Sequence, residues 1–123
     1  MLEATKGMTM QLRGIGFVGS HTAARAEMGA FLRDVLGLEP TAVDGIGADL
    51  FALPDGDVFA VASLPEDGVA ERTIGLLVTD LDTAIDELHA AGVETDGIAE
   101  NARWRYTHFR APDGRLYELV EER

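Results

Sequence analysis

The side chain best suited to chemistry in this sequence is Glu118, a carboxylate within an apolar run near the C-terminus. Glu118 alternates with Leu116 and Val120, and residues two apart in a β-strand point to the same face of a sheet. A carboxylate among apolar side chains loses hydration, which raises its pKa toward the range of a general base. The alternative is a structural ion pair in which Arg13 or Arg72 holds Glu118 as a carboxylate. Sequence alone leaves both interpretations open.

A segment shortly before Glu118 carries further candidates, because Trp104, Tyr106 and His108 alternate and so share one face of a strand. His108 faces either a cavity, together with Tyr106, or the outer or interface side of the sheet. In a cavity, His108 or Tyr106 could stabilise a developing oxyanion while Glu118 removes a proton next to a carbonyl group. The rings of Phe51, Trp104 and Tyr106 could instead stack on a flat or cationic ligand.

The other histidines do not extend this candidate site. His21 precedes an expected helix, and His89 lies outside the apolar stripe of a second expected helix, so we expect capping or solvent-facing roles. The chain has no cysteine, which excludes disulfides and thiolate chemistry. No Ser/His/Asp or phosphate-loop signature occurs in the sequence, and Gly45-Ile46-Gly47 predicts only a turn.

The charge of the chain is strongly acidic. The sequence contains 22 Asp and Glu residues and 10 Lys and Arg residues, which gives a formal net charge of −12. Nucleic acid is therefore not an expected partner. The negative field either attracts a cationic ligand or serves to keep the surface soluble.

Length and composition indicate one globular domain, since 123 residues with 46% hydrophobic and 26% charged residues suit a chain with a real core. The first ten residues lack the apolar region of a signal peptide, and no apolar run is long enough to span a membrane. We therefore expect a cytoplasmic protein without membrane contact. Residues 1–9 are expected to form a flexible tail and residues 10–123 the single domain.

The chain contains an internal duplication. The turn sequence Pro-Asp-Gly occurs at residues 54–56 and again at 112–114, each time before a period-two apolar run, and 112 minus 54 gives a separation of 58 residues. The pattern Arg-x-Ile-Gly occurs at 13–16 and 72–75, and 72 minus 13 is 59. The recurring separation indicates two similar structural units. Glycines in the segment 12–18 also predict that another group approaches this strand closely.

We therefore predict two modules, residues 10–63 and 72–122, joined by a linker at 64–71. Each module should follow the order strand, helix, strand, strand, strand. The strands are expected at 12–18, 38–43, 48–53, 57–63, 73–78, 93–98, 103–110 and 116–121. Modules of about 60 residues bury only about 60% of their unfolded surface, so the two should share a sheet, a core or a subunit interface.

Both expected helices carry one apolar stripe at helical spacing, which predicts that they pack on the core. The first helix ends before Gly37 and has a stripe of Ala24, Met28, Phe31, Leu32 and Val35. The second begins after the N-cap Asp80, ends at Gly92 and has a stripe of Leu81, Ala84, Ile85, Leu88 and Ala91.

This order of elements, with the helix ending at Phe31–Leu38, the helix start at Val78–Asp82 and the final segment Pro112–Leu119, resembles the vicinal oxygen chelate superfamily. That superfamily includes glyoxalase I, extradiol dioxygenases, fosfomycin-modifying enzymes and bleomycin-resistance proteins. The resemblance covers about residues 10–122. It implies an α+β fold in which two tandem βαβββ modules form curved half-barrel sheets with a concave cavity, usually in a homodimer.

The resemblance also implies positions for a divalent metal. Metal-dependent members place a histidine near the start of the first strand of each module and a glutamate on the last strand. Carried over by position, these residues are Gly14, Thr73 and Glu118, and the duplicate of Glu118 in the first module is Ala60. Only Glu118 can ligate, and one carboxylate holds a transition metal poorly. We therefore expect no metal and no cofactor.

These observations favour a metal-free protein that binds a small cationic or aromatic molecule, as bleomycin-resistance proteins do. The residues expected to contact the ligand are Phe51, Thr73, Trp104 and Tyr106. The alternative is a metal-independent lyase or isomerase with Glu118 and His108 as catalytic residues, and a third hypothesis is a metal-dependent glyoxalase-type lyase or dioxygenase. The expected partners are the small molecule and a second copy of the chain in a homodimer.

Overall fold

The structure, a computed structural model, describes residues 11–123, so the predicted tail at 1–9 lies outside the described residues. The strands are β1 (Leu12–His21), β2 (Glu39–Thr41), β3 (Asp49–Ala52), β4 (Val58–Ala62), β5 (Glu71–Val78), β6 (Ala99–Glu100), β7 (Trp104–Arg110) and β8 (Leu116–Glu122). The helical segments are α1 (Arg25–Ala30), the π-helical η2 (Phe31–Val35) and α2 (Leu81–Ala90).

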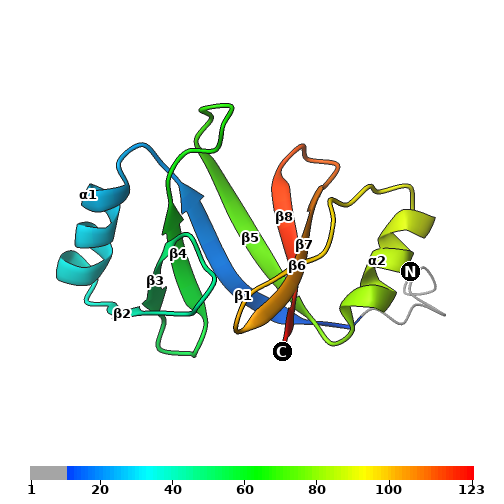
Figure 1. Cartoon of the computed structure of the whole chain (residues 1–123), viewed down its shortest axis with the longest axis horizontal. Coiled ribbons are helices and arrows are strands. Elements are labelled where there is room, and N and C mark those ends of the chain that lie inside the picture. Colours follow the sequence, from blue (N-terminus) through cyan, green and yellow to red (C-terminus); the bar gives the residue numbers. More distant parts are fainter. Residues whose placement is uncertain (1–10) are drawn as a thin grey trace.

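The strands form one eight-stranded sheet in the order β2-β3-β4-β1-β5-β8-β7-β6. In the first module β1 runs parallel to β4, and in the second β5 runs parallel to β8. The modules join where β1 and β5 pair antiparallel, with Phe17 opposite Gly75. Figure 1 shows the curled sheet between α1 at one end and α2 at the other. The predicted α+β fold of two tandem βαβββ modules is confirmed, and its halves form one continuous sheet within a single chain.

Each module covers one face of its strands with its own helix. Under α1 and η2 the buried cluster is Leu32, Phe51 and Val61. Under α2 the buried cluster is Val78, Leu81, Ala84, Ile85 and Leu119. A third cluster joins Leu50 and Val58 of the first module to Trp104 and Val120 of the second. The modules therefore share a core as well as a sheet, which agrees with the small size of each.

The first helix differs from the prediction because its second half is π-helical. The backbone N–H of Leu36 donates to the carbonyl of Phe31, five residues earlier, at 3.1 Å. A π turn shifts the angular position of the side chains relative to a regular α-helix. Leu32 stays buried, whereas Phe31 and Val35 are 45% and 68% exposed. The predicted stripe was therefore wrong at Phe31 and Val35, since it assumed a 3.6-residue period throughout.

The predicted strand at 93–98 was also wrong, because the strand that pairs with β7 here is β6, at Ala99–Glu100. The cause is Asp96, whose Oδ1 accepts the backbone N–H of His108 at 2.7 Å and the hydroxyl of Thr107 at 3.0 Å. A side chain that accepts a backbone N–H of a strand takes the place of a carbonyl group from a neighbouring strand. The segment before β6 therefore runs irregularly beside β7.

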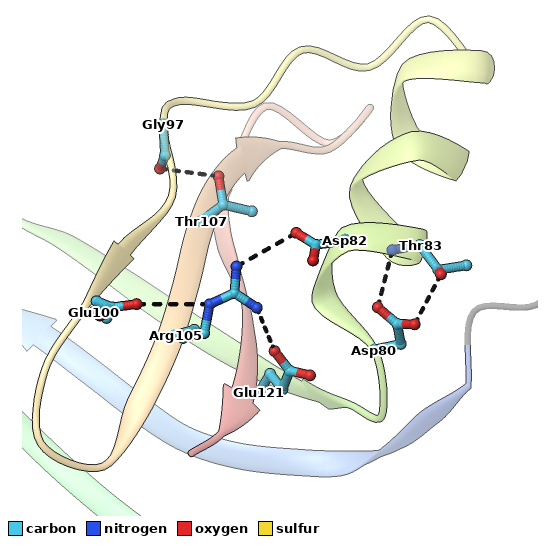
Figure 2. Close-up of polar contacts among 8 residues, drawn as sticks. All are labelled: Asp80, Asp82, Thr83, Gly97, Glu100, Arg105, Thr107 and Glu121. Carbon is cyan, nitrogen blue, oxygen red and sulfur yellow. Dashed lines mark hydrogen bonds and ion pairs between the residues drawn. The ribbon is translucent and has the colours of Figure 1, made fainter.

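Ion pairs fix β7 and α2 in place. The guanidinium of Arg105 on β7 lies 2.8 Å from Glu121 Oε1 and 3.4 Å from Asp82 Oδ1, which links β7 to β8 and to the first turn of α2 (Figure 2). In the same view the carboxylate of Asp80 accepts the backbone N–H of Thr83 at 3.2 Å. The predicted N-cap of α2 is confirmed. Because Arg105 lies between Trp104 and Tyr106 in sequence, this anchoring holds the strand that carries both rings.

Glycines of the central strands allow side chains to approach the sheet. A Cβ atom on Gly16 would lie 3.3 Å from Val120 Cγ2, so the predicted close approach to the first strand is confirmed at this position. A Cβ atom on Gly75 would overlap the ring of Phe17. The Phe17 ring therefore lies against β5 where the two modules meet.

Candidate functional site

A cavity of about 260 Å³ lies on the face of the sheet opposite the helices. Successive residues of a strand point to opposite faces, and Ala60 lines the cavity whereas Val61 packs under α1. Its apolar lining includes Phe17, Leu50, Val58, Ala60, Trp104 and Tyr106. Its polar lining includes His21, Thr73, His108 and Glu118, which come from the neighbouring strands β1, β5, β7 and β8. Both modules therefore contribute to one cavity.

Glu118 and His108 form a direct pair within this lining. They are opposite each other in the antiparallel ladder of β7 and β8, and His108 Nε2 lies 2.7 Å from Glu118 Oε1. Glu118 is only 8% exposed. The other carboxylate oxygen of Glu118 has no hydrogen-bond partner among residues 11–123, so it is available to a molecule in the cavity.

Asp96 completes a chain of three titratable groups. Its Oδ2 lies 2.8 Å from His108 Nδ1, on the side of the imidazole ring away from Glu118. Burial acts to raise the pKa of Asp96, but the hydrogen bonds from the backbone and ring of His108 outweigh it and hold that pKa below its usual range. Asp96 therefore stays a carboxylate and fixes the orientation of the His108 ring.

The two partners of His108 decide where the proton lies. The hydrogen bond to Glu118 raises the pKa of His108 to about 9, against the opposing effect of desolvation. Burial raises the pKa of Glu118, and the hydrogen bond from His108 opposes that rise. We place the proton on the ring, because an imidazolium can donate to both carboxylates at once, whereas a neutral imidazole has only one N–H. Near neutral pH the site contains an imidazolium between two carboxylates.

Two buried polar atoms of the cavity lack partners. Thr73 is 3% exposed, and neither its Oγ1 nor the Nδ1 of His21 has a hydrogen-bond partner among the described residues. Thr73 pairs with Gly19 on β1, and His21 lies two residues further along that strand on the same face. Buried polar groups are normally hydrogen-bonded, so two orphaned atoms lining one cavity need an explanation.

The expectation that His21 has a capping or solvent-facing role was wrong. β1 continues to His21, which pairs with Glu71 of β5 and lines the cavity. The signal in the sequence was the alternation of Phe17, Gly19 and His21, which places all three on one face of a strand. The predicted strand at 12–18 was too short to show it.

No family model and no curated protein matches the chain, but solved structures do. Methylmalonyl-CoA epimerase from Mycobacterium tuberculosis superposes with a TM-score of 0.74 at 22% identity, over 89% of this chain and 88% of that one. A glyoxalase/bleomycin resistance protein/dioxygenase superfamily member from Vibrio splendidus gives 0.62 at 15%, over 94% and 100%. The Mn(II)-bound glyoxalase from Novosphingobium aromaticivorans gives 0.69 at 21%, over 92% of this chain and 40% of that one.

The chain has the fold of the vicinal oxygen chelate superfamily. The resemblance predicted from the sequence is confirmed at the level of the fold. In the described part of the chain, no helix combines the length and apolar character that crossing a membrane requires.

The vicinal oxygen chelate fold brings most of the predicted site residues together, but not Phe51. Thr73, Trp104, Tyr106, His108 and Glu118 all line the cavity. Phe51 is on the other face of β3, where it packs with Leu32 and Val61, while its neighbour Leu50 takes the place in the cavity. The expectation that Phe51 lines the cavity was therefore wrong, because alternation along β3 turns it toward the helix.

The predicted arginine partners of Glu118 are not found. Arg13 lies 3.7 Å from Glu122, and the partner of Glu118 is His108. No ion pair joins Arg72 to Glu118 within residues 11–123. The interpretation of Glu118 as a carboxylate paired with an arginine was therefore wrong, because Glu118 pairs with His108.

The residues present do not fit the divalent metal that the vicinal oxygen chelate resemblance implies. Within residues 11–123, no group of three or more histidine and acidic side chains could hold a metal ion. At the implied positions, Gly14 and Ala60 offer no ligand atom and Thr73 only a hydroxyl. Both ring nitrogens of His108 are engaged by carboxylates.

Proposed function

We propose that the chain binds a small organic molecule in the cavity and does so without a resident metal. The observation that carries this proposal is the pair of orphaned atoms, Thr73 Oγ1 and His21 Nδ1, which line the cavity beside the buried Glu118. Each buried polar group without a partner costs about 1–3 kcal/mol. A ligand that supplies the missing partners recovers this free energy, so the cavity is prepared for a polar ligand atom.

The lining favours a flat ligand that is neutral or cationic. The indole of Trp104 and the ring of Phe17 form an aromatic wall with centroids 6.5 Å apart. No lysine or arginine lines the cavity in the described part of the chain, while Glu118 adds a carboxylate to it. With a net charge of −12, the protein also repels anions. The name of the epimerase points to a CoA ester as its substrate. We do not propose such an ester as the ligand of this chain, because no lysine or arginine of the described residues lines the cavity to bind its phosphates.

A ligand series that varies only in charge tests this proposal. Naphthylmethylammonium, naphthylmethanol and naphthoate share one flat ring system and carry a positive, a neutral and a negative head. We expect the first two to bind by isothermal titration calorimetry, and naphthoate to bind at least about tenfold more weakly than either. Equal binding of all three, or binding of naphthoate alone, would contradict the proposed ligand class, and no binding of any would contradict the proposed function.

Thr73→Val should stabilise the ligand-free protein and weaken ligand binding. Valine has the shape of threonine without its hydroxyl, so it removes an orphaned group, and the free energy of unfolding should rise by about 1–3 kcal/mol. The matched control is Thr107→Val, because the Thr107 hydroxyl is also fully buried but donates to Asp96. That variant should lose about 1–3 kcal/mol. Urea unfolding of both variants checks this difference in sign, and destabilisation by Thr73→Val would show that its hydroxyl has a partner in the free protein.

We also expect the purified protein to contain no stoichiometric transition metal, because Glu118 is the only ligating residue at the implied metal positions. Elemental analysis after purification without chelator is the measurement. About one equivalent of Zn, Ni, Fe or Mn per cavity would overturn the metal-free part of the proposal.

The homodimer and the cytoplasmic location expected from the sequence remain predictions. Leu12 and Ile15 on β1 are 56% and 50% exposed. Exposed apolar side chains of this size support a homodimer in which β1 contacts the second copy of the chain.

A further inference from the structure

Three polar atoms at one end of the cavity define which edge of a ligand fits there. Glu118 offers a free carboxylate oxygen, while Thr73 Oγ1 and His21 Nδ1 have no hydrogen-bond partner among the described residues. We propose that the ligand is a flat heterocycle with a lactam edge, whose ring N–H donates to Glu118 and whose neighbouring ring carbonyl accepts from Thr73 and His21. The inference rests on the proposed function, because it names the chemical class of the molecule bound in that cavity.

Glu118 requires a donor on the ligand. Its Oε1 lies 2.7 Å from Nε2 of the protonated His108 ring, so the carboxyl group is ionised and both of its oxygens only accept. Glu118 is only 8% exposed, and a buried carboxylate oxygen that faces a ligand without an N–H or O–H group loses hydration without compensation. The ligand must therefore turn a hydrogen atom toward β8.

Thr73 and His21 require an acceptor instead. A threonine hydroxyl always carries a hydrogen atom, and the Thr73 hydroxyl finds no acceptor for it in the described part of the chain. His21 Nδ1 is a second donor in the tautomer that carries its proton there. One carbonyl oxygen has two lone pairs and can accept from both side chains. A second N–H in place of the carbonyl, as in an amidine, would leave the hydrogen atom of Thr73 without an acceptor.

The sheet register sets these three side chains on neighbouring strands. Glu118 on β8 pairs with Gly75 on β5, and Thr73 lies two residues from Gly75 on the same face. Thr73 in turn pairs with Gly19 on β1, and His21 lies two residues along β1. A lactam has its N–H and its carbonyl on adjacent ring atoms, so one group can face β8 while the other faces β5 and β1. The single oxygen of a hydroxyl group would have to meet all three strands at one point.

The ring of Phe17 supplies a flat surface beside these polar atoms. A Cβ atom on Gly75 would overlap that ring, and a Cβ atom on Gly19 would lie 3.4 Å from Phe17 Cε2. The ring therefore lies over the two glycines, next to the strand positions of Glu118 and Thr73. Because aromatic rings favour offset stacking, a bicyclic lactam that stacks on Phe17 brings its polar edge toward Glu118 and Thr73.

Two bicyclic compounds that differ at one ring position test the inference. 2-Quinolone has a ring N–H next to its carbonyl, whereas coumarin has a ring oxygen at that position and keeps the carbonyl. We expect 2-quinolone to bind the wild-type protein at least about tenfold more tightly than coumarin by isothermal titration calorimetry near neutral pH. The reason is that coumarin turns a lone pair, instead of an N–H, toward the Glu118 carboxylate.

Two variants assign the two parts of the lactam edge. Glu118→Gln replaces the carboxylate by an amide that can donate as well as accept, so the preference for 2-quinolone should shrink to about threefold or less. Thr73→Val removes a donor to the carbonyl that both compounds share, so both should bind about 3- to 10-fold more weakly while the preference remains. Tyr117→Phe is the control, because the Tyr117 hydroxyl donates to Asp113 outside the cavity lining, and it should leave both affinities unchanged.

The outcomes distinguish this inference from the proposed function. If naphthylmethanol binds but 2-quinolone shows no tenfold preference over coumarin, the lactam assignment is wrong and the binding function stands. A preference that persists unchanged in Glu118→Gln would overturn the contact of the N–H with Glu118, and unchanged affinities in Thr73→Val would overturn the contact of the carbonyl with Thr73. If neither these two compounds nor the naphthyl series binds, the proposed function fails and the lactam assignment fails with it.

Discussion

The free energy of unfolding should fall as the pH rises from about 6.5 to about 9, because the folded protein holds a proton on His108 that the unfolded chain releases. The pKa of His108 is raised from 6.5 to about 9 by its hydrogen bond to Glu118. A folded-state pKa above the unfolded value contributes stability that is fully present below pH 6.5 and is lost as the pH passes through 9. The difference of about 2.5 between the folded and unfolded pKa values of His108 corresponds to about 3 kcal/mol of unfolding free energy. Solvent screening of the partly exposed ring reduces this contribution to about 2 kcal/mol.

The groups that face His108 support this assignment of the pH window. Asp96 and Glu118 contact its two ring nitrogens and are the anions that retain the proton. The ring of Tyr106 meets it edge-on with centroids 5.7 Å apart, and burial raises the pKa of Tyr106 above 10.0, beyond the window. The loss of stability should therefore belong to His108.

Urea unfolding at a series of pH values measures this loss, with two variants for comparison. His108→Gln should have a flat profile between pH 6.5 and 9, and it should be less stable than the wild type at pH 6.5, because Glu118 loses a charged partner. His89→Gln removes a histidine of α2 that contacts Thr95, outside the cavity lining, and should keep the wild-type slope. A flat wild-type profile, or a sloping one in His108→Gln, would show that the ring is not the group that retains the proton.

Local chemistry explains why the turns and the site strands could be predicted from the sequence. Asp55 and Asp113 each accept the backbone N–H of the residue two positions later at 2.9 Å, so the Pro-Asp-Gly turns are fixed by residues within them. Period-two alternation then places Tyr106 and His108 on one face of their strand, whereas the pairing of β7 with β8 is what sets Glu118 opposite His108. The turns and the alternation needed only short-range information.

The features missed by the sequence analysis depend on contacts between distant segments. Asp96 lies in an irregular segment, and only the folded loop brings it to His108, twelve residues later. The exclusion of Phe51 from the cavity follows from which face of β3 the helix covers, since Leu50 and Phe51 are both apolar and alternation alone does not choose between them. The π turn at η2 is instead a local feature, and it breaks the single helical period on which the stripe at Phe31 was based.

Trp104→Ala should lower the free energy of unfolding by about 3–5 kcal/mol, the largest loss that we expect from a single apolar truncation here. Trp104 is 7% exposed and belongs to the cluster that contains Leu50 and Val58 of one module and Val120 of its own. Its removal leaves a cavity at the place where the two modules share their core. Modules of about 60 residues bury only about 60% of their unfolded surface, so we expect that loss to weaken the whole domain.

Two comparison variants separate this core role from a general loss of aromatic surface. Trp104→Phe keeps an apolar ring in the cluster and should cost less than the alanine variant. Phe31 on η2 is 45% exposed, so Phe31→Ala should cost markedly less than Trp104→Ala. Guanidinium unfolding followed by circular dichroism measures all three, since Trp104 is the only tryptophan and its fluorescence is lost with it. Equal losses in Trp104→Ala and Phe31→Ala would mean that the ring of Trp104 contributes no more to the shared core than an exposed ring does.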